Sequence, residues 1–267
     1  MLKKSLLIIV LTLGLSTDVV LTNLVAIAKP GLNASIARTH NKNRTNRSSI
    51  LGFKIPRNRL SRNREGGVPA GAPCVNDISA LLPPRPKNLE VSKAPVEPTL
   101  ASHPTFFVDI PEKSPEQATF ILRDENDEVL LKEDIALKSV NGIVAYTLPK
   151  RFKGLEVGKK YIWRFSLLCN SDDLSGNPKI SAWITRIVPS TSIFRKLGAA
   201  KDDFDRLVIY AENGFWHETL KTLVDLRAAK PNDQIIVESW NNVLKSVDLD
   251  YLAKKPVITV TGVPSEW

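Results

Sequence analysis

Residues 160–169 have the sequence KYIWRFSLLC, and this stretch gives the clearest indication of the fold class. Every second side chain is apolar or aromatic, at Tyr161, Trp163, Phe165, Leu167 and Cys169. Successive side chains of a β-strand point to opposite faces of its sheet, so a period of two predicts a strand with one buried face. We therefore expect the chain around this stretch to be rich in β-structure.

Further strand signals lie on both sides of it. They cover residues 105–110, 118–122, 129–131, 142–148 and 180–188. The turn-forming residues 124–128 stand between two of these apolar runs, which predicts a hairpin. Short strands separated by turn signals are typical of an antiparallel, immunoglobulin-like β-sandwich. We predict such a sandwich domain over residues 71–190.

The apolar period becomes helical after Pro189. Asp202 and Asp233 are suited to cap helices, and Gly214 and Pro231 are suited to end them. The spacing is close to that of one tetratricopeptide repeat, carried by Leu207, Tyr210, Gly214, Trp216, Leu220, Leu223, Leu226 and Pro231. The sequence thus predicts an α+β protein with a helical hairpin unit over residues 191–256 and a tail over 257–267.

The first 28 residues have the parts of a secretory signal peptide in order. Lys3 and Lys4 precede an apolar run, and a small-x-small pattern ends at Ala28. Cleavage after Ala28 predicts a periplasmic or secreted protein of the cell envelope. A leader that is retained as a membrane anchor is the alternative. No later apolar run approaches the roughly 18 residues that cross a bilayer.

The net charge of +9 arises in one segment. Residues 29–64 contain ten Lys or Arg and no acid, whereas residues 65–267 have a net charge of −2. Residues 29–70 are too polar to form a core, which predicts a disordered basic linker. This linker is expected either to contact an anionic surface or to serve as a solvated spacer. Basic charge confined to a linker does not indicate a nucleic-acid-binding domain.

The chain has two cysteines, Cys74 and Cys169. In an exported protein we expect them to form one disulfide, and two buried free thiols are the alternative.

Motifs that carry chemistry are missing from the sequence. The three histidines, His40, His103 and His217, have no metal-ligand spacing, and no nucleophile or phosphate-binding motif is found. The acids of residues 124–128 alternate as in a calcium loop but lack its glycine and distal Glu, which favours a solvated turn. We therefore predict no catalytic residue, no metal and no cofactor.

The chain from Gly71 to about Pro256 resembles the family catalogued as domain of unknown function 928. The resemblance is carried by Cys74, residues 80–83, 104–106, Pro111, 148–149, Leu155, Val157, Gly158, Lys159, Tyr161, Trp163, Cys169, Arg186, Tyr210, Ala211, Gly214, Phe215, Trp216, Leu226, Arg227, Trp240 and Leu244. In that family's pattern an aromatic residue and an Asp follow the Trp, where this chain has His217 and Glu218. The resemblance implies an exported cyanobacterial protein with a two-part layout, and it implies no known activity.

These observations favour a non-enzymatic binding or scaffolding module of the cell envelope. Its partner would be an envelope protein or a wall polymer, and Tyr210, Phe215 and an outward-facing His217 are the candidate contacts. A carbohydrate- or peptidoglycan-binding module and an enzyme of unrecognised type acting on an envelope polymer are the alternatives.

Overall fold

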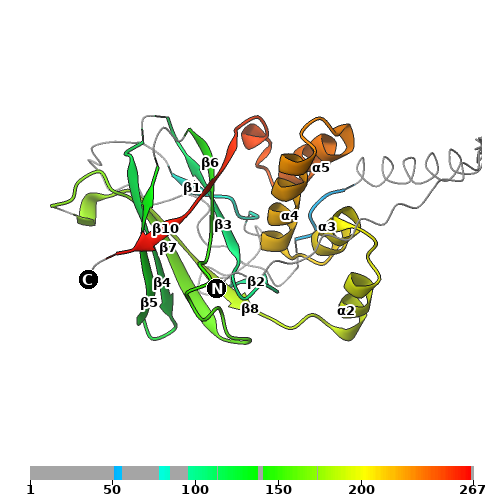
Figure 1. Cartoon of the computed structure of the whole chain (residues 1–267), viewed down its shortest axis with the longest axis horizontal. Coiled ribbons are helices and arrows are strands. Elements are labelled where there is room, and N and C mark those ends of the chain that lie inside the picture. The colour runs from blue at the N-terminus through cyan, green and yellow to red at the C-terminus, as the bar shows by residue number, and fades with distance from the viewer. Residues whose placement is uncertain are drawn as a thin grey trace, which may run out of the picture. The chain divides into compact units, whose positions relative to one another are not determined.

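The computed structural model describes residues 51–55, 78–84, 96–112, 114–137, 141–172 and 174–265 (Figure 1). These residues form two sheets, in which most neighbouring strands are antiparallel, and four α-helices. The α+β class predicted from the sequence is confirmed.

Sheet A contains four of the described strands in the order β1-β3-β6-β9. Their bounds are Ser79–Ala80 for β1, Thr105–Ile110 for β3, Gly142–Thr147 for β6 and Val257–Val260 for β9. β9 pairs parallel with β6, and the other pairs are antiparallel. β3 and β6 are buried along nearly their whole length, as their unbroken apolar runs predict.

Sheet B contains six of the described strands in the order β10-β5-β4-β7-β8-β2. Their bounds are Gly262–Pro264 for β10, Val129–Ala136 for β5, Gln117–Asp124 for β4, Lys160–Leu167 for β7, Lys179–Arg186 for β8 and Val96–Thr99 for β2. β7 is the strand predicted from KYIWRFSLLC, and its alternation of buried and half-buried side chains is confirmed. The predicted hairpin is formed by β4 and β5.

The two sheets pack face to face through aromatic side chains. Phe106 of sheet A lies 5.0 Å, ring centre to ring centre, from both Phe120 and Trp163 of sheet B. Tyr146 of sheet A lies 4.5 Å from Phe120. These rings are at most 1% exposed, so this layer is the centre of the hydrophobic core.

The helices follow β8 and lie beside the sheets (Figure 1). Their bounds are Thr191–Gly198 for α2, Asp203–Glu212 for α3, Trp216–Ala229 for α4 and Gln234–Lys245 for α5, and short 3₁₀ turns cover Leu174–Gly176 and Asp250–Leu252. The predicted caps Asp202 and Asp233 accept backbone N–H groups of the helices that they precede. Gly214 has φ +76° and lets the chain reverse between α3 and α4. None of the helices in the described ranges is long and apolar enough to cross a membrane.

The chain returns to the sheets after the helices. β9 adds to sheet A and β10 to sheet B, so residues 257–264 run across both sheets (the red segment of Figure 1). The sequence predicts only a tail here. The helices are therefore an insertion between β8 and β9 rather than a unit appended after the sheets.

Five residues of the predicted disordered linker are ordered, which corrects the prediction for residues 51–55. Leu51 and Phe53 are 5% exposed, and the Phe53 ring meets Trp216 edge to face at 4.7 Å. The backbone N–H of Lys54 donates to the carbonyl of Ala211 at 3.0 Å. This segment is extended and packs against the helices. The predicted signal peptide with its cleavage residue Ala28, Cys74 and the remainder of the predicted linker lie outside the described residues.

Candidate functional site

The structure places the three predicted contact residues mostly in the interior. Phe215 and His217 are 3% exposed, and Tyr210 is half-buried. Burial raises the pKa of the Tyr210 hydroxyl above its ordinary value. The expectation that His217 faces outward is wrong, because its Nδ1 lies 2.9 Å from the carbonyl oxygen of Thr105 in β3. A carbonyl only accepts, so Nδ1 carries the proton and donates it.

His217 belongs to an anchor triplet, Trp216, His217 and Glu218, which joins the first turn of α4 to the sheets. The indole N–H of Trp216 donates to the carbonyl of Leu81 at 2.6 Å. Glu218 Oε1 accepts three hydrogen bonds from the end of β2 and the two residues after it: the hydroxyl of Thr99 at 2.6 Å, the N–H of Leu100 at 2.7 Å and the N–H of Ala101 at 3.1 Å. The sequence singled out these positions through Trp216 and the two residues after it, and in this chain they attach α4 to the sheets.

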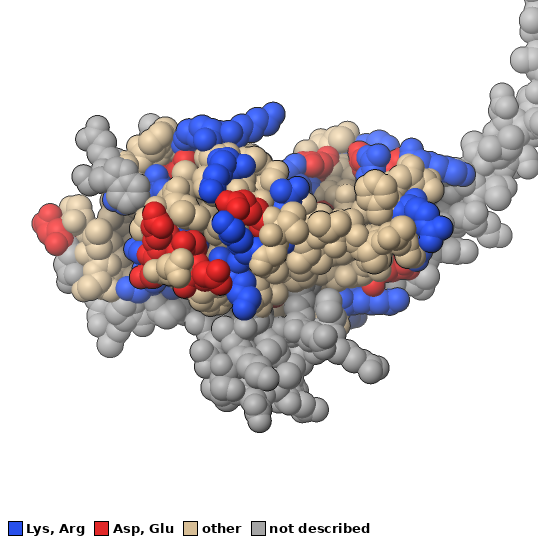
Figure 2. All heavy atoms as spheres, turned by 90° about the horizontal axis from the view of Figure 1, so that it is seen from below, with Lys and Arg blue, Asp and Glu red and all other residues tan. Residues whose placement is uncertain are grey.

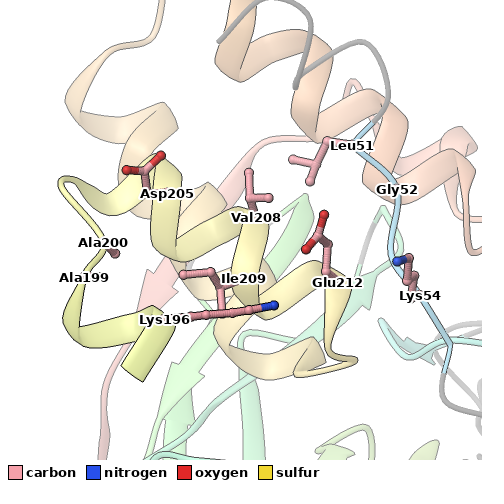
Figure 3. A pocket seen from close by; sticks show the side chains of 10 residues that line it. All are labelled: Leu51, Gly52, Lys54, Lys196, Ala199, Ala200, Asp205, Val208, Ile209 and Glu212. Atoms are coloured by element: carbon pink, nitrogen blue, oxygen red, sulfur yellow. The ribbon is translucent and has the colours of Figure 1, made fainter. Parts of the chain in front are cut away.

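A first hollow, of about 680 Å³, opens between residues 51–54, α2 and α3, and we call it the helical hollow (Figure 3). Leu51, Val208 and Ile209 supply its apolar surface. Its charged groups are Lys54, Lys196, Asp205 and Glu212. Lys196 extends from α2 toward α3, and the carboxylate of Glu212 points into the space between α3 and residues 51–54 (Figure 3). The hollow thus offers apolar surface and both signs of charge.

The chain that leads into α2 presents an uncharged surface. Residues 187–194, which connect β8 with α2 and begin that helix, contain no charged side chain, and Figure 2 shows this uncharged surface from below. Val188 is 69% exposed and Phe194 is 68% exposed. No residue of α2 is buried. Large apolar side chains that are exposed on an uncharged surface are typical of an interaction surface.

A second hollow, of about 340 Å³, lies on the outer face of sheet B, and we call it the sheet hollow. Its floor is formed by outward side chains of β5, β4, β7 and β8, and it is bordered by Leu168, Ser171, Leu174, Asn177 and Ser265. Lys132, Arg164 and Lys179 are its cations, and Asp134 is its one acid among the described lining residues.

A buried carboxylate lies where β10 meets β5. Glu133 is fully buried and accepts hydrogen bonds from the Tyr146 hydroxyl, at 3.0 Å, and from the Arg151 guanidinium. Burial first, and then the charge of Glu133, raise the pKa of Tyr146 far above its ordinary value. A Cβ added to Gly262 would lie 2.2 Å from Glu133 Oε2, so β10 closes directly over this group. The cluster holds residues 262–264 in place and leaves no space for a substrate.

In the acidic turn 124–128, the first carboxylate forms hydrogen bonds with backbone N–H groups of the same turn. Asp124 Oδ1 accepts the N–H groups of Asn126 and Glu128, both at 2.9 Å, and the bond from Glu128 is the main reason that the pKa of Asp124 is lowered. Within the described ranges, no group of three or more His, Cys, Asp or Glu could hold a metal ion.

Cys169 lies half-buried just beyond β7, and its N–H donates to Asn177 Oδ1 at 3.1 Å. The described part of the chain contains no free cysteine. The predicted pairing of Cys169 with Cys74 stays a prediction, because Cys74 lies outside the described residues.

Comparison with known proteins gives one match. A family model described as Domain of Unknown Function (DUF928) matches residues 41–257, which includes both hollows except Ser265. No curated protein and no solved structure matches the chain.

Proposed function

The chain belongs to the family described as Domain of Unknown Function (DUF928), and we propose that it is an exported, non-enzymatic binding module of the cell envelope. In this proposal the helical hollow takes a segment of a partner protein. The family membership confirms the resemblance found in the sequence and assigns no activity.

The observation that carries the proposal is the lining of the helical hollow. A volume of about 680 Å³ is within the range of roughly 300–1,000 Å³ that ligand pockets have. Apolar side chains beside separate lysines and carboxylates suit a peptide segment, which carries apolar groups and charges of both signs. Val188 and Phe194 offer further exposed apolar surface in the connector before α2 and in the first turn of that helix.

The wall formed by residues 51–54 is held firmly in place. The N–H of Phe53 donates to Ser246 Oγ at 2.8 Å, and the N–H of Lys54 donates to Ala211. A rigid wall lowers the conformational entropy that the chain itself loses when a partner binds.

Finer features of the fold belong to the same proposal. We propose that the two sheets form an immunoglobulin-like sandwich, supported by their face-to-face aromatic packing. We propose that α3 and α4 form a single tetratricopeptide-like hairpin, supported by their mutual packing and the turn at Gly214. Export, cleavage after Ala28 and a Cys74–Cys169 disulfide complete the proposal, and they are supported by the order of the leader's parts.

Photo-cross-linking in the native envelope tests the proposal. A photoreactive residue at position 196, in the wall of the hollow, is compared with one at position 157, where Val157 is 50% exposed outside it. We expect one identified envelope protein to be captured from position 196 and not from 157. Glu212→Lys should lower that yield several-fold, while Glu128→Lys, an equal change in the β4–β5 turn, should not. Equal capture from both positions, or a yield unchanged by Glu212→Lys, overturns the proposal.

A further inference from the structure

We infer that the sheet hollow is a binding site for an acidic saccharide, a sugar unit that carries a carboxylate. The site is separate from the helical hollow, so this inference goes beyond the proposed partner binding. It rests on the arrangement of charged and hydroxyl side chains on the outer face of sheet B.

Strand register fixes the floor of the hollow. Ile121 of β4 pairs with Lys132 on one side and with Arg164 on the other. In the next row Thr119 lies between Asp134 and Ser166. Since neighbouring strands lie about 4.8 Å apart, the backbones of Lys132 and Arg164 are about 10 Å apart across Ile121. The two cations therefore face each other across an apolar floor.

Lys179, the first residue of β8, is the third cation. It pairs with Ser166 of β7, so the three cations form a triangle. None of the three cations forms an ion pair within the described residues. Arg164 Nε donates to Ser181 Oγ at 3.2 Å, and Lys179 Nζ donates to the carbonyl of Ser175 at 3.4 Å. Most of their donors remain available for a ligand.

The one acid of the hollow does not neutralise this charge. Asp134 Oδ1 accepts the Thr119 hydroxyl at 3.3 Å and forms no ion pair within the described ranges. Among the lining residues that the structure describes, three cations and one acid give a net charge of +2, although residues 65–267 as a whole have a net charge of −2. Charge complementarity therefore calls for an anionic ligand.

The remaining lining selects a sugar over a bare anion. The hydroxyls of Thr119, Ser166 and Ser171 can donate to or accept from sugar hydroxyls. Ile121 and Leu174 offer apolar contact, and Leu174 is 62% exposed in the loop that borders the hollow. A sugar ring has one apolar C–H face and a rim of hydroxyls, and its carboxylate accepts paired hydrogen bonds from a guanidinium such as that of Arg164.

The test uses calorimetric titration of the full-length chain with tetragalacturonate, an oligosaccharide with one carboxylate on each sugar. Residues 29–64 carry ten cations that attract any polyanion, so substitutions in the hollow decide the result. Arg164→Gln and Lys132→Gln each remove one cation of the triangle. Lys160→Gln is the matched control, because Lys160 is exposed on the same strand as Arg164 and outside the hollow.

We expect saturable binding that Arg164→Gln weakens about tenfold, as the loss of one charge-assisted hydrogen bond predicts, with a similar loss for Lys132→Gln. Lys160→Gln should change the affinity less than about twofold. The methyl ester of the same oligosaccharide, which has no charge, should bind at least about tenfold more weakly.

Three results would overturn the inference. One is equal weakening by Arg164→Gln and Lys160→Gln, which would assign binding to general positive charge. Another is equal binding of the methyl ester, and the third is full competition by inorganic phosphate at the same concentration, since a bare anion would then be enough.

Discussion

Replacing Glu218 by alanine should strongly destabilise the protein, because one carboxylate oxygen of this residue joins α4 to the end of β2 and the two residues after it. Oε1 accepts hydrogen bonds of 2.6, 2.7 and 3.1 Å from Thr99, Leu100 and Ala101. The alanine variant loses all three bonds. The Leu100 N–H is left without this acceptor, whereas the Ala101 N–H keeps its second acceptor, Thr99 Oγ1, at 3.1 Å. The helices then remain attached to the sheets by Trp216, His217 and apolar packing.

The expected magnitude follows from these bonds. A hydrogen bond to a charged group contributes about 1.5–3 kcal/mol, and three at the lower value give about 4.5 kcal/mol. Water that enters the space left by the carboxylate offsets part of this loss, so we expect about 3 kcal/mol. For a chain of this length that corresponds to a fall in Tm of roughly 6–12 °C. Glu218→Gln keeps Oε1 as an acceptor without its charge, and it should cost about 1 kcal/mol.

Urea unfolding followed by tryptophan fluorescence and by circular dichroism measures both variants. Glu212→Ala is the control, since Glu212 is exposed on α3, and its effect should stay within about 0.5 kcal/mol. If the free energy of unfolding of Glu218→Ala is within about 1 kcal/mol of that of the unmodified protein, the three hydrogen bonds do not stabilise the fold as expected. Equal losses for Glu218→Ala and Glu218→Gln would show that acceptor geometry is not what matters.

Three further predictions concern other parts of the chain. Phe53→Ala should lower the free energy of unfolding by about 3 kcal/mol in the same assay, because a buried aromatic ring is lost, whereas Lys54→Ala, an exposed neighbour, should change it by less than about 0.5 kcal/mol. The raised pKa of buried Tyr146 means that the folded state keeps a proton which the unfolded state releases near pH 10, so stability should fall as pH rises above about 10. Tyr146→Phe should make that fall shallower between about pH 9 and 11, and an unchanged slope would contradict the assignment. Intact mass of the protein from its native envelope should begin near Lys29 with no thiol open to alkylation, and a full-length mass with two alkylated cysteines would contradict export.

The sequence is sufficient for elements whose signal is local. The alternation in residues 160–167 and the apolar runs of β3 and β6 predict strands because each pattern is set by the faces of its own strand. The caps Asp202 and Asp233 likewise act within one turn of their helices. These elements are found close to their predicted bounds.

Elements that depend on distant partners were missed. β2 contains Pro98 and pairs parallel with a strand more than 80 residues later, so it has no local strand pattern. Residues 257–260, VITV, do favour a strand, but only their pairing with β6 shows that they belong to the sheets. Leu51 and Phe53 resemble isolated apolar residues of a linker until the helices that cover them are formed.

The surroundings of the candidate contact residues also depend on distant parts of the chain. The sequence indicates which residues are unusual around Trp216, but not which side of α4 faces the sheets. His217 therefore looked like a surface residue, although it donates to a backbone carbonyl in β3. The two hollows join residues from three or more elements, and no spacing within one element predicts them.

The return of residues 257–264 to both sheets also sets the order of events during folding. A chain that emerges N-terminus first has made β3 to β8 long before the strands that cover β6 and β5 are available. Until then β6 and β5 each have one edge without its native neighbouring strand. Glu133 also lacks the backbone of Gly262 that closes over it. Completion of the fold thus waits for the last-made strands. In the exported protein that we propose, such a delay would keep the chain unfolded during translocation, so that the native state forms only after the last strands are released.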